Sequence, residues 1–387
     1  MCFLYFFKKI KKIHMKINKR KINEFTKLAC YNLVIFFALI FFIDLVLGNY
    51  LKKKSPARDI PIVDFSKSRK WDVANLYKNK KQDSKNIIEY VRDENGFRSF
   101  EKNHSKKIVL TVGGSTTAQK AITEKRTWQD LLDLILPEYD FVNGGIDGFT
   151  SYAHLVSLNN WYPSALINYD VDTIIYYVGL NDIPLLYSER AYKLEKITTW
   201  QRLKKYFLNN SLILKKTYLI FRITKHKVSD GAFDGFTAGI KRTSDKDFIK
   251  GQVPIKKFNY LNSTNADKYK FLIQKLISKT YEKFPNSKIV LIQQQYPGCD
   301  FVDKFSVKNR LPYEYSYYDR YDFCISQGQV YLQQNLAISS LNLKKPPIVI
   351  PMYLKEILLD KDVYDYVHTN PEGSKKIAEY IKLQLWP

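Results

Sequence analysis

Short apolar runs alternate with amphipathic stretches along most of this chain, and this alternation restricts the fold more than any other feature. The expected strands are residues 107–112, 140–142, 173–178, 288–293 and 348–350, and the expected helices lie near residues 127–136, 151–161, 269–277 and 371–385. Strands that alternate with helices pair in parallel and carry helices on both faces of the sheet. The sequence therefore predicts an α/β fold that binds ligands at the carboxyl ends of its strands.

Four short segments beside these runs carry residue types used in nucleophilic catalysis. They read Val-Gly-Gly-Ser-Thr-Thr at 112–117, Asn-Gly-Gly-Ile-Asp-Gly at 143–148, Val-Gly-Leu-Asn-Asp at 178–182 and Asp-Tyr-Val-His at 365–368. Ser115 follows a predicted strand, where N–H groups at the start of a helix favour a developing oxyanion. Asp365 precedes His368 by three residues, close enough to hold the imidazole in the tautomer of a general base. Ser115, His368 and Asp365 are predicted to form a catalytic triad.

Each segment alone also fits an ordinary turn, cap or loop, so the prediction depends on their occurrence together in one order. In that order they resemble the SGNH hydrolase family, also called GDSL-type esterases, whose four blocks supply a Ser, a Gly, an Asn and an Asp-x-x-His. The resemblance spans residues 105–385, with an interruption. It implies a three-layer α/β/α sandwich with a parallel, flavodoxin-like central sheet. The first block departs from Gly-Asp-Ser-Leu, since residues 113–116 read Gly-Gly-Ser-Thr.

The resemblance implies a role for each matching residue and no metal or other cofactor. Ser115 would be the nucleophile, and its N–H would form the oxyanion hole with the N–H of Gly145 and the amide of Asn181. His368 would be the base, oriented by Asp365. The expected activity is that of a serine ester hydrolase that removes short acyl groups, chiefly O-acetyl, from cell-envelope or extracellular glycans. The alternatives are an O-acyltransferase, a lysophospholipase on the same fold, and a catalytically idle glycan-binding protein.

An apolar run near the N-terminus predicts a membrane-spanning signal anchor over residues 29–51. Residues 33–43 are wholly apolar, and with its flanks the run reaches the roughly 20 residues that a spanning helix needs. Nine Lys or Arg residues precede it and three lysines follow it. Residues 1–28 are therefore expected in the cytoplasm, and the catalytic part in the periplasm or outside the cell. The alternative is a buried core helix. The carboxylate of Asp44 favours this alternative, because a charged group within the hydrocarbon of a membrane is costly.

Residues 52–104 are expected to be a connector, and residues 105–387 a hydrolase domain with an insertion at about 183–260. The connector ends in a turn signal at Asn95-Gly96, which predicts a hairpin or loop packed beside the first strand of the core. The insertion is basic, and an apolar stripe at helical spacing over residues 212–223 predicts a cap helix over the site or contact with an anionic membrane surface. The net charge of +24 does not indicate a nucleic-acid partner, because no aromatic-basic recognition motif accompanies it.

The remaining histidines and the cysteines carry weaker signals. The other histidines have no partner at metal-ligand spacing, and we expect surface or packing roles for them. They are His14, His104, His154 and His226. Cys299 and Cys324 are the cysteines outside the membrane segment and its cytoplasmic flank. In an oxidising compartment they could form a disulfide, or they could remain two thiols. The sequence leaves both outcomes open.

Overall fold

The computed structural model of the chain describes residues 19–50, 67–72, 87–98, 106–188, 248–311 and 322–387. Several predicted segments lie wholly or mostly outside the described residues. They are the basic segment 1–28, the connector 52–104, and the insertion at about 183–260 with its apolar stripe. His14, His104 and His226 lie outside the described residues as well. The chain divides into two units, Met1–Lys53 with Ile197–Phe233 and Lys54–Lys196 with Asp234–Pro387, and each is described by itself.

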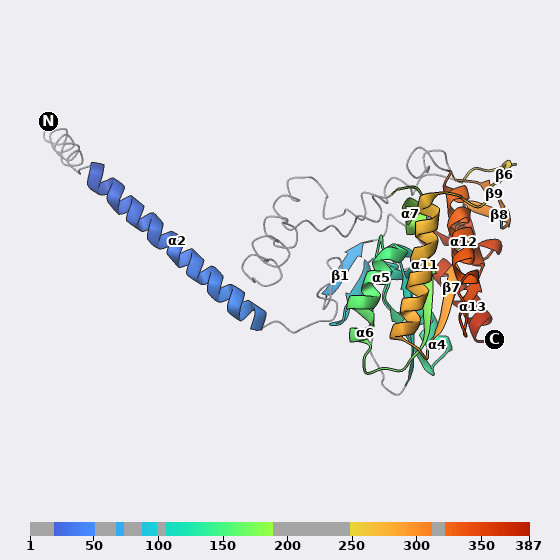
Figure 1. The fold of residues 1–387 in the computed structure, drawn as a ribbon, viewed down its shortest axis with the longest axis horizontal. Helices are drawn as coiled ribbons and strands as arrows, with labels where there is room; N and C mark the ends of the chain where they lie inside the picture. The colour runs from blue at the N-terminus through green and yellow to red at the C-terminus, as the bar shows by residue number, and fades with distance from the viewer. Residues whose placement is uncertain (1–18, 51–66, 73–86, 99–105, 189–247, 312–321) are drawn as a thin grey trace. The chain divides into compact units, whose positions relative to one another are not determined.

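The described part of the first unit is helix α2 (Lys19–Tyr50), drawn in blue in Figure 1. Its window Lys27–Asp44 has a mean hydropathy of 1.9 and no buried residues. Large apolar side chains such as Leu33 and Phe36 are more than half exposed. The predicted apolar N-terminal helix is therefore present, and by length and composition it could cross a membrane, as could the apolar part of a signal sequence.

A five-stranded parallel sheet forms the centre of the second unit (Figure 1). In spatial order its strands are β10 (Ile348–Ile350), β7 (Lys288–Gln293), β5 (Val171–Val178), β3 (Lys107–Gly113) and β4 (Tyr139–Asn143). Read from β4 and numbered along the chain, the order is 2-1-3-4-5, which is flavodoxin-like. The predicted α/β fold with a parallel central sheet is confirmed. The strand order reverses between β3 and β5, which is where open α/β sheets bind ligands.

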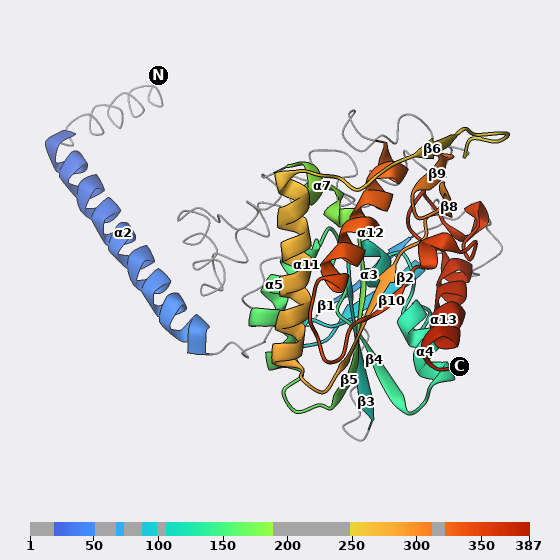
Figure 2. The same ribbon diagram turned by 45° about the vertical axis from the view of Figure 1, so that its right-hand side comes forward.

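Helices cover both faces of the sheet because strand residues alternate between two cores. In β3, Ile108, Leu110 and Val112 belong to one buried cluster and Val109 belongs to the other. The first cluster is closed by α5 (Ser151–Asn160), α6 (Tyr162–Ala165), α7 (Ile183–Tyr187), α11 (Thr264–Lys283) and α12 (Phe323–Ser339). The second is closed by α4 (Trp128–Ile135) and α13 (Pro371–Leu385), which lie together on the other side of the sheet (Figure 2). The result is the predicted three-layer α/β/α arrangement.

Helix α12 and a small second sheet were not predicted from the sequence. Helix α12 is buried on most sides and includes buried glutamines, so no amphipathic pattern marks it. The second sheet is antiparallel and consists of β6 (Ile255–Lys257), β9 (Ser306–Asn309) and β8 (Cys299–Asp303). A disulfide between Cys299 and Cys324, whose Cα atoms are 5.4 Å apart, joins β8 to the start of α12. The sequence left open a disulfide or two thiols, and the structure contains the disulfide.

The segment before β3, which is predicted to be a connector that ends in a hairpin or loop beside the core, packs into the second unit. Strand β1 (Lys67–Asp72) pairs antiparallel with β2 (Ile87–Arg92). Ile88 and Phe97 are almost completely buried, and the Phe97 ring stacks on Trp161 with centroids 5.1 Å apart. The core therefore begins before residue 105, where the domain boundary was expected.

Candidate functional site

Ser115 is the first residue of α3 (Ser115–Ala118), a helical turn that follows β3 almost directly. The connection is sharp because glycine leaves no side chain in it: a Cβ on Gly114 would come within 2.3 Å of the Asn181 amide nitrogen. The half-buried Ser115 side chain therefore lies at the carboxyl end of the sheet, near Asn181. Its own N–H makes no hydrogen bond within the described residues, so this donor at the start of the helix is available to a ligand.

Asp365 and His368 lie on a tight loop that leads into α13. The Tyr364 N–H donates to the His368 carbonyl at 3.0 Å and closes the loop. Inside it, Asp365 Oδ1 accepts two backbone N–H groups of the same loop, at 2.7 and 2.6 Å. These bonds fix the carboxylate and leave its second oxygen to face the imidazole. The Tyr364 ring stacks on the His368 ring with an interplanar angle of 10°.

Ser115, His368 and Asp365 form one continuous hydrogen-bond chain. The distance from His368 Nε2 to Ser115 Oγ is 2.6 Å, and the distance from His368 Nδ1 to Asp365 Oδ2 is also 2.6 Å. The structure thus brings together the three residues that the sequence predicted as a triad. Chemically this is a hydroxyl nucleophile, a base within reach of its proton, and a carboxylate that orients the base.

Carboxylates offset the effect of burial on His368. Burial lowers the pKa of His368, but the charge and hydrogen bond of Asp365 and the charge of Asp147 raise it, and the net shift is upward. Burial raises the pKa of Asp365, but His368 and the two backbone N–H groups lower it, and the net shift is downward. Asp147 itself binds Lys120 at 2.6 Å. Asp365 therefore stays ionised and favours the imidazolium form of His368.

Asn181 follows β5 in a 3-10 turn, η3 (Leu180–Asp182). One of its amide hydrogens goes to the Phe149 carbonyl at 2.9 Å, which leaves the other for a ligand. The neighbouring Asp182 is completely buried and accepts hydrogen bonds from the N–H and hydroxyl of Ser151, at 2.7 and 2.6 Å, and from the Tyr269 hydroxyl at 2.9 Å. Burial raises the pKa of Asp182 to about 6. Asp182 thus anchors the turn that presents Asn181.

The Gly145 N–H, which is predicted to be an oxyanion donor, has a partner within the protein. The Gly145 N–H donates to the Asn143 side-chain oxygen at 2.9 Å, so in this structure it is already paired. Its Cα faces α3, since a Cβ there would lie 2.4 Å from the Ala118 nitrogen. The reason is local: an Asn two residues earlier captures the hydrogen in an Asx-type turn. Gly148, in the same loop, has a φ of 74° and an N–H without an acceptor among the described residues.

Two buried glutamines that were not singled out in the sequence tie the site together. Gln119 follows α3, and its amide donates to the hydroxyls of Thr369 and Ser374 at 2.8 and 2.5 Å. It thereby joins the end of α3 to the start of α13. Gln294 follows β7 and donates to the Thr116 hydroxyl at 2.8 Å. No local pattern signals these contacts, because the partners lie far apart along the chain.

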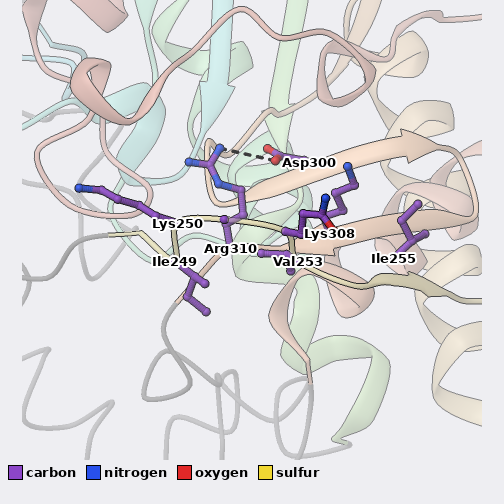
Figure 3. Close-up of a pocket in the computed structure, with 9 residues that line it drawn as sticks. Ile249, Lys250, Val253, Ile255, Asp300, Lys308 and Arg310 are labelled. Atoms are coloured by element: carbon purple, nitrogen blue, oxygen red, sulfur yellow. Dashed lines mark hydrogen bonds and ion pairs between the residues drawn. The ribbon is translucent and has the colours of Figure 1, made fainter.

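A polar groove, shown in Figure 3, has a volume of about 640 Å³. It is lined by residues 249–253 and by Ile255, Asp300, Lys308 and Arg310. Arg310 points toward Asp300, at 3.5 Å, and also binds Asp360 at 2.9 Å. Next to the groove, Phe248 packs edge-on against Tyr366 of the loop that carries Asp365 and His368, with ring centroids 5.2 Å apart. The mixed charged and aliphatic lining suits the polar part of a ligand better than a long acyl chain.

Within the described residues, no cluster of His, Cys, Asp or Glu could hold a metal ion. His154 is completely buried, and its Nδ1 lies 3.2 Å from the Tyr162 hydroxyl. Burial lowers the pKa of His154 to about 3, so the ring stays neutral near pH 7. This histidine therefore packs inside the fold.

Comparisons with known proteins find similarity among solved structures. No protein-family model and no curated protein matches the chain. The chain is similar to an acetyl xylan esterase from Geobacillus stearothermophilus, with 14% identity and a TM-score of 0.38, over 74% of this chain and 97% of that one. It is also similar to a member of the lipolytic protein G-D-S-L family from Veillonella parvula, with 13% identity and a TM-score of 0.36, over 72% and 98%. At these values the argument for function rests on the side chains of the site.

Proposed function

We propose that this chain is a serine ester hydrolase in which Ser115 is the nucleophile, His368 the general base and Asp365 the group that orients the base. The observation that carries the proposal is the hydrogen-bond chain from Ser115 Oγ through the imidazole to Asp365 Oδ2, with both distances at 2.6 Å. Its place at the carboxyl ends of the strands, where the strand order reverses, adds support.

In the first half-reaction His368 Nε2 takes the proton of Ser115 as Oγ attacks the acyl carbonyl of the ester. The imidazolium then gives this proton to the leaving alcohol, and an acyl group remains on Ser115. In the second half-reaction His368 takes a proton from water, which attacks the acyl carbonyl. The bond from the acyl carbon to Ser115 Oγ then breaks, the imidazolium returns the proton to Oγ, and the acid is released. Asp365 holds Nδ1 as a donor throughout, so that Nε2 can accept.

The negative charge of each tetrahedral intermediate needs donors that are not already paired. We assign this role to the Ser115 N–H and to the second amide hydrogen of Asn181. The third proposed donor is the Gly145 N–H, which in this structure donates to the Asn143 side-chain oxygen at 2.9 Å and would have to leave that acceptor to bind an oxyanion. The dipole at the start of α3 acts in the same direction.

For the substrate we propose a short acyl ester, most readily O-acetyl, on a cell-envelope or extracellular glycan. The motif segments are rich in polar residues, and the groove beside the catalytic loop has a polar lining. For the location we propose that α2 anchors the chain in the cell membrane, with the basic N-terminal segment in the cytoplasm and the site outside it. We thus propose an acylated glycan as the substrate, attachment to the membrane through α2, and no nucleic-acid partner.

The test uses the full-length chain in detergent micelles and a series of p-nitrophenyl esters from acetyl to decanoyl. We expect the highest kcat/KM for acetyl, release of acetate from acetylated glycan, and labelling of Ser115 by a fluorophosphonate probe. Ser115→Ala should abolish all three. A preference for decanoyl esters would replace the glycan substrate by a lipid, and transfer of acetyl to a sugar hydroxyl would make the enzyme an acyltransferase. If Ser115 is not labelled and no ester is hydrolysed, the chain is a binding protein without catalytic activity.

A further inference from the structure

We propose that Arg92 and Arg98 are positioning residues of the Ser115 site. Their guanidinium groups hold α3, the nucleophile helix, and the loop of residues 143–148, the glycine loop, at a fixed spacing. The proposal rests on the esterase function proposed for that site. Both arginines precede the central sheet: Arg92 ends β2, and Arg98 forms an antiparallel bridge with Asn143 at the end of β4. They therefore connect the segment before the sheet to the carboxyl ends of its strands, where Ser115 lies.

Arg98 caps the carboxyl end of α3. It is 1% exposed, and its guanidinium donates to the carbonyls of Ala118, Gln119 and Ile122, each at 2.5 Å. A helix of one turn makes few internal hydrogen bonds, so its last carbonyls need donors from elsewhere. Because Ser115 begins this turn and Ala118 ends it, Arg98 restrains the whole nucleophile segment.

Arg92 acts on the glycine loop and, through one peptide group, on the strand before the nucleophile. Its guanidinium is almost completely buried and donates to the Gly145 carbonyl at 2.6 Å. The N–H of the same peptide group belongs to Ile146 and donates to the Gly113 carbonyl at 2.9 Å. A cation on one side of a peptide strengthens the hydrogen bond on the other side. Arg92 thus ties the loop to the residue two positions before Ser115.

The two arginines are themselves held in place. The Tyr90 ring centroid lies 5.5 Å from Arg92 Cζ and 4.8 Å from Arg98 Cζ, and the Tyr90 hydroxyl accepts a hydrogen bond from Arg92 Nε at 2.6 Å. Glu124 binds Arg98 Nε at 3.1 Å and also accepts the Val91 N–H at 2.7 Å. Burying a guanidinium is costly unless its N–H groups are matched. Arg92 also donates to the Gly96 carbonyl, so each guanidinium has partners in its own surroundings as well as at α3 or the glycine loop. A lysine ammonium cannot reproduce this planar fork of donors.

The experiment introduces Arg92→Lys and Arg98→Lys into the full-length chain and measures p-nitrophenyl acetate hydrolysis well below the Tm of each variant. We expect kcat to fall by about tenfold to hundredfold, as for a reacting group displaced by up to about 1 Å, while KM changes by less than about twofold. Thr280→Val is the matched control. Thr280 is completely buried and shares a hydrogen bond of 2.6 Å with Tyr176, but it belongs to α11 and has no hydrogen bond to α3. It should lower Tm and leave kcat unchanged.

Amide hydrogen exchange separates positioning from a general loss of stability. In the arginine variants exchange should quicken within residues 114–119 and 144–148, and in Thr280→Val it should not. Wild-type kcat in both arginine variants would overturn the proposal, as would an equal loss of kcat in Thr280→Val. If the wild-type chain hydrolyses no ester, the proposed function fails on its own. Faster exchange confined to the two segments would then still support the positioning role, and unchanged exchange would refute it.

Discussion

Replacing Asp365 by Asn is the sharpest test of the proposed triad, because the loop dictates how the new amide must lie. In the native protein, Oδ1 accepts the N–H groups of Val367 and His368 at 2.7 and 2.6 Å, and Oδ2 faces His368 Nδ1 at 2.6 Å. An Asn side chain has one oxygen acceptor and one NH2 donor. In Asp365→Asn the oxygen must stay with the two backbone N–H groups, so the NH2 group turns toward Nδ1.

This orientation reverses the imidazole tautomer. Nδ1 now accepts from the amide, and the ring proton moves to Nε2. Nε2 then faces Ser115 Oγ as a donor and cannot take its proton. In a Ser-His-Asp triad the wrong tautomer lowers kcat by about 10⁴-fold, which corresponds to about 5 kcal/mol at the transition state. The backbone hydrogen bonds of the loop survive, so Tm should change little.

The assay compares kcat for p-nitrophenyl acetate and the rate of fluorophosphonate labelling, and both should fall together. Asp362→Asn is the control. Asp362 is also buried, just before the same loop, and it binds Lys376 at 2.6 Å, but it makes no bond to His368. This variant should keep its turnover. If Asp365→Asn keeps more than about one tenth of the wild-type kcat, a loss below about 1.4 kcal/mol, the proposed orientation of the base is wrong.

Four other substitutions test the surroundings of the triad. Asn181→Ala should lower kcat by about a hundredfold or more, the usual cost of one oxyanion donor, and an unchanged kcat would remove Asn181 from the hole. Burial raises the pKa of Asp182 to about 6 from 3.8, so the stability that this carboxyl contributes is fully present below pH 3.8 and is lost as pH rises through about 6. Asp182→Asn should therefore weaken the fall of Tm across that interval, and parallel Tm–pH curves would contradict this account. Gly145→Ala should cost roughly 1–3 kcal/mol of stability, because its Cβ would lie 2.4 Å from the Ala118 nitrogen. Gly144→Ala, with its nearest atom 3.1 Å away, should cost less, and calorimetry that ranks the two in the opposite order would refute the packing argument.

The residues of the proposed triad could be predicted because their signals are local. Asp365 and His368 are three residues apart on one loop, and Ser115 stands directly after an apolar run in a glycine-rich turn. The strands of the central sheet are also local signals, since a strand buried on both faces is a continuous apolar run. These features need no knowledge of tertiary contacts, so the fold class and the order of its layers could be read from them.

The parts that could not be predicted depend on contacts between distant segments. Arg98 reads as an ordinary charged residue after a turn, and only the fold shows that α3 lies over its guanidinium. Helix α12 buries polar side chains such as Gln327 and Gln334, so no apolar stripe reveals it. At Gly145 the motif position could be predicted, but whether its N–H has an acceptor within the protein depends on the rotamer of Asn143, which the sequence does not specify.

The charges around His368 favour the protonated form that a general base adopts during the reaction. Burial alone would disfavour the imidazolium, and Asp365 and Asp147 offset that cost. In the proposed mechanism the imidazolium forms together with an oxyanion nearby, and in a partly buried site these opposite charges stabilise each other more than they would in water. Arg98 restrains α3 without opposing this arrangement, because Glu124, 3.1 Å from its Nε, offsets its positive charge. The same buried segment can therefore fix the position of the nucleophile while leaving the basicity of His368 under the control of its own carboxylates.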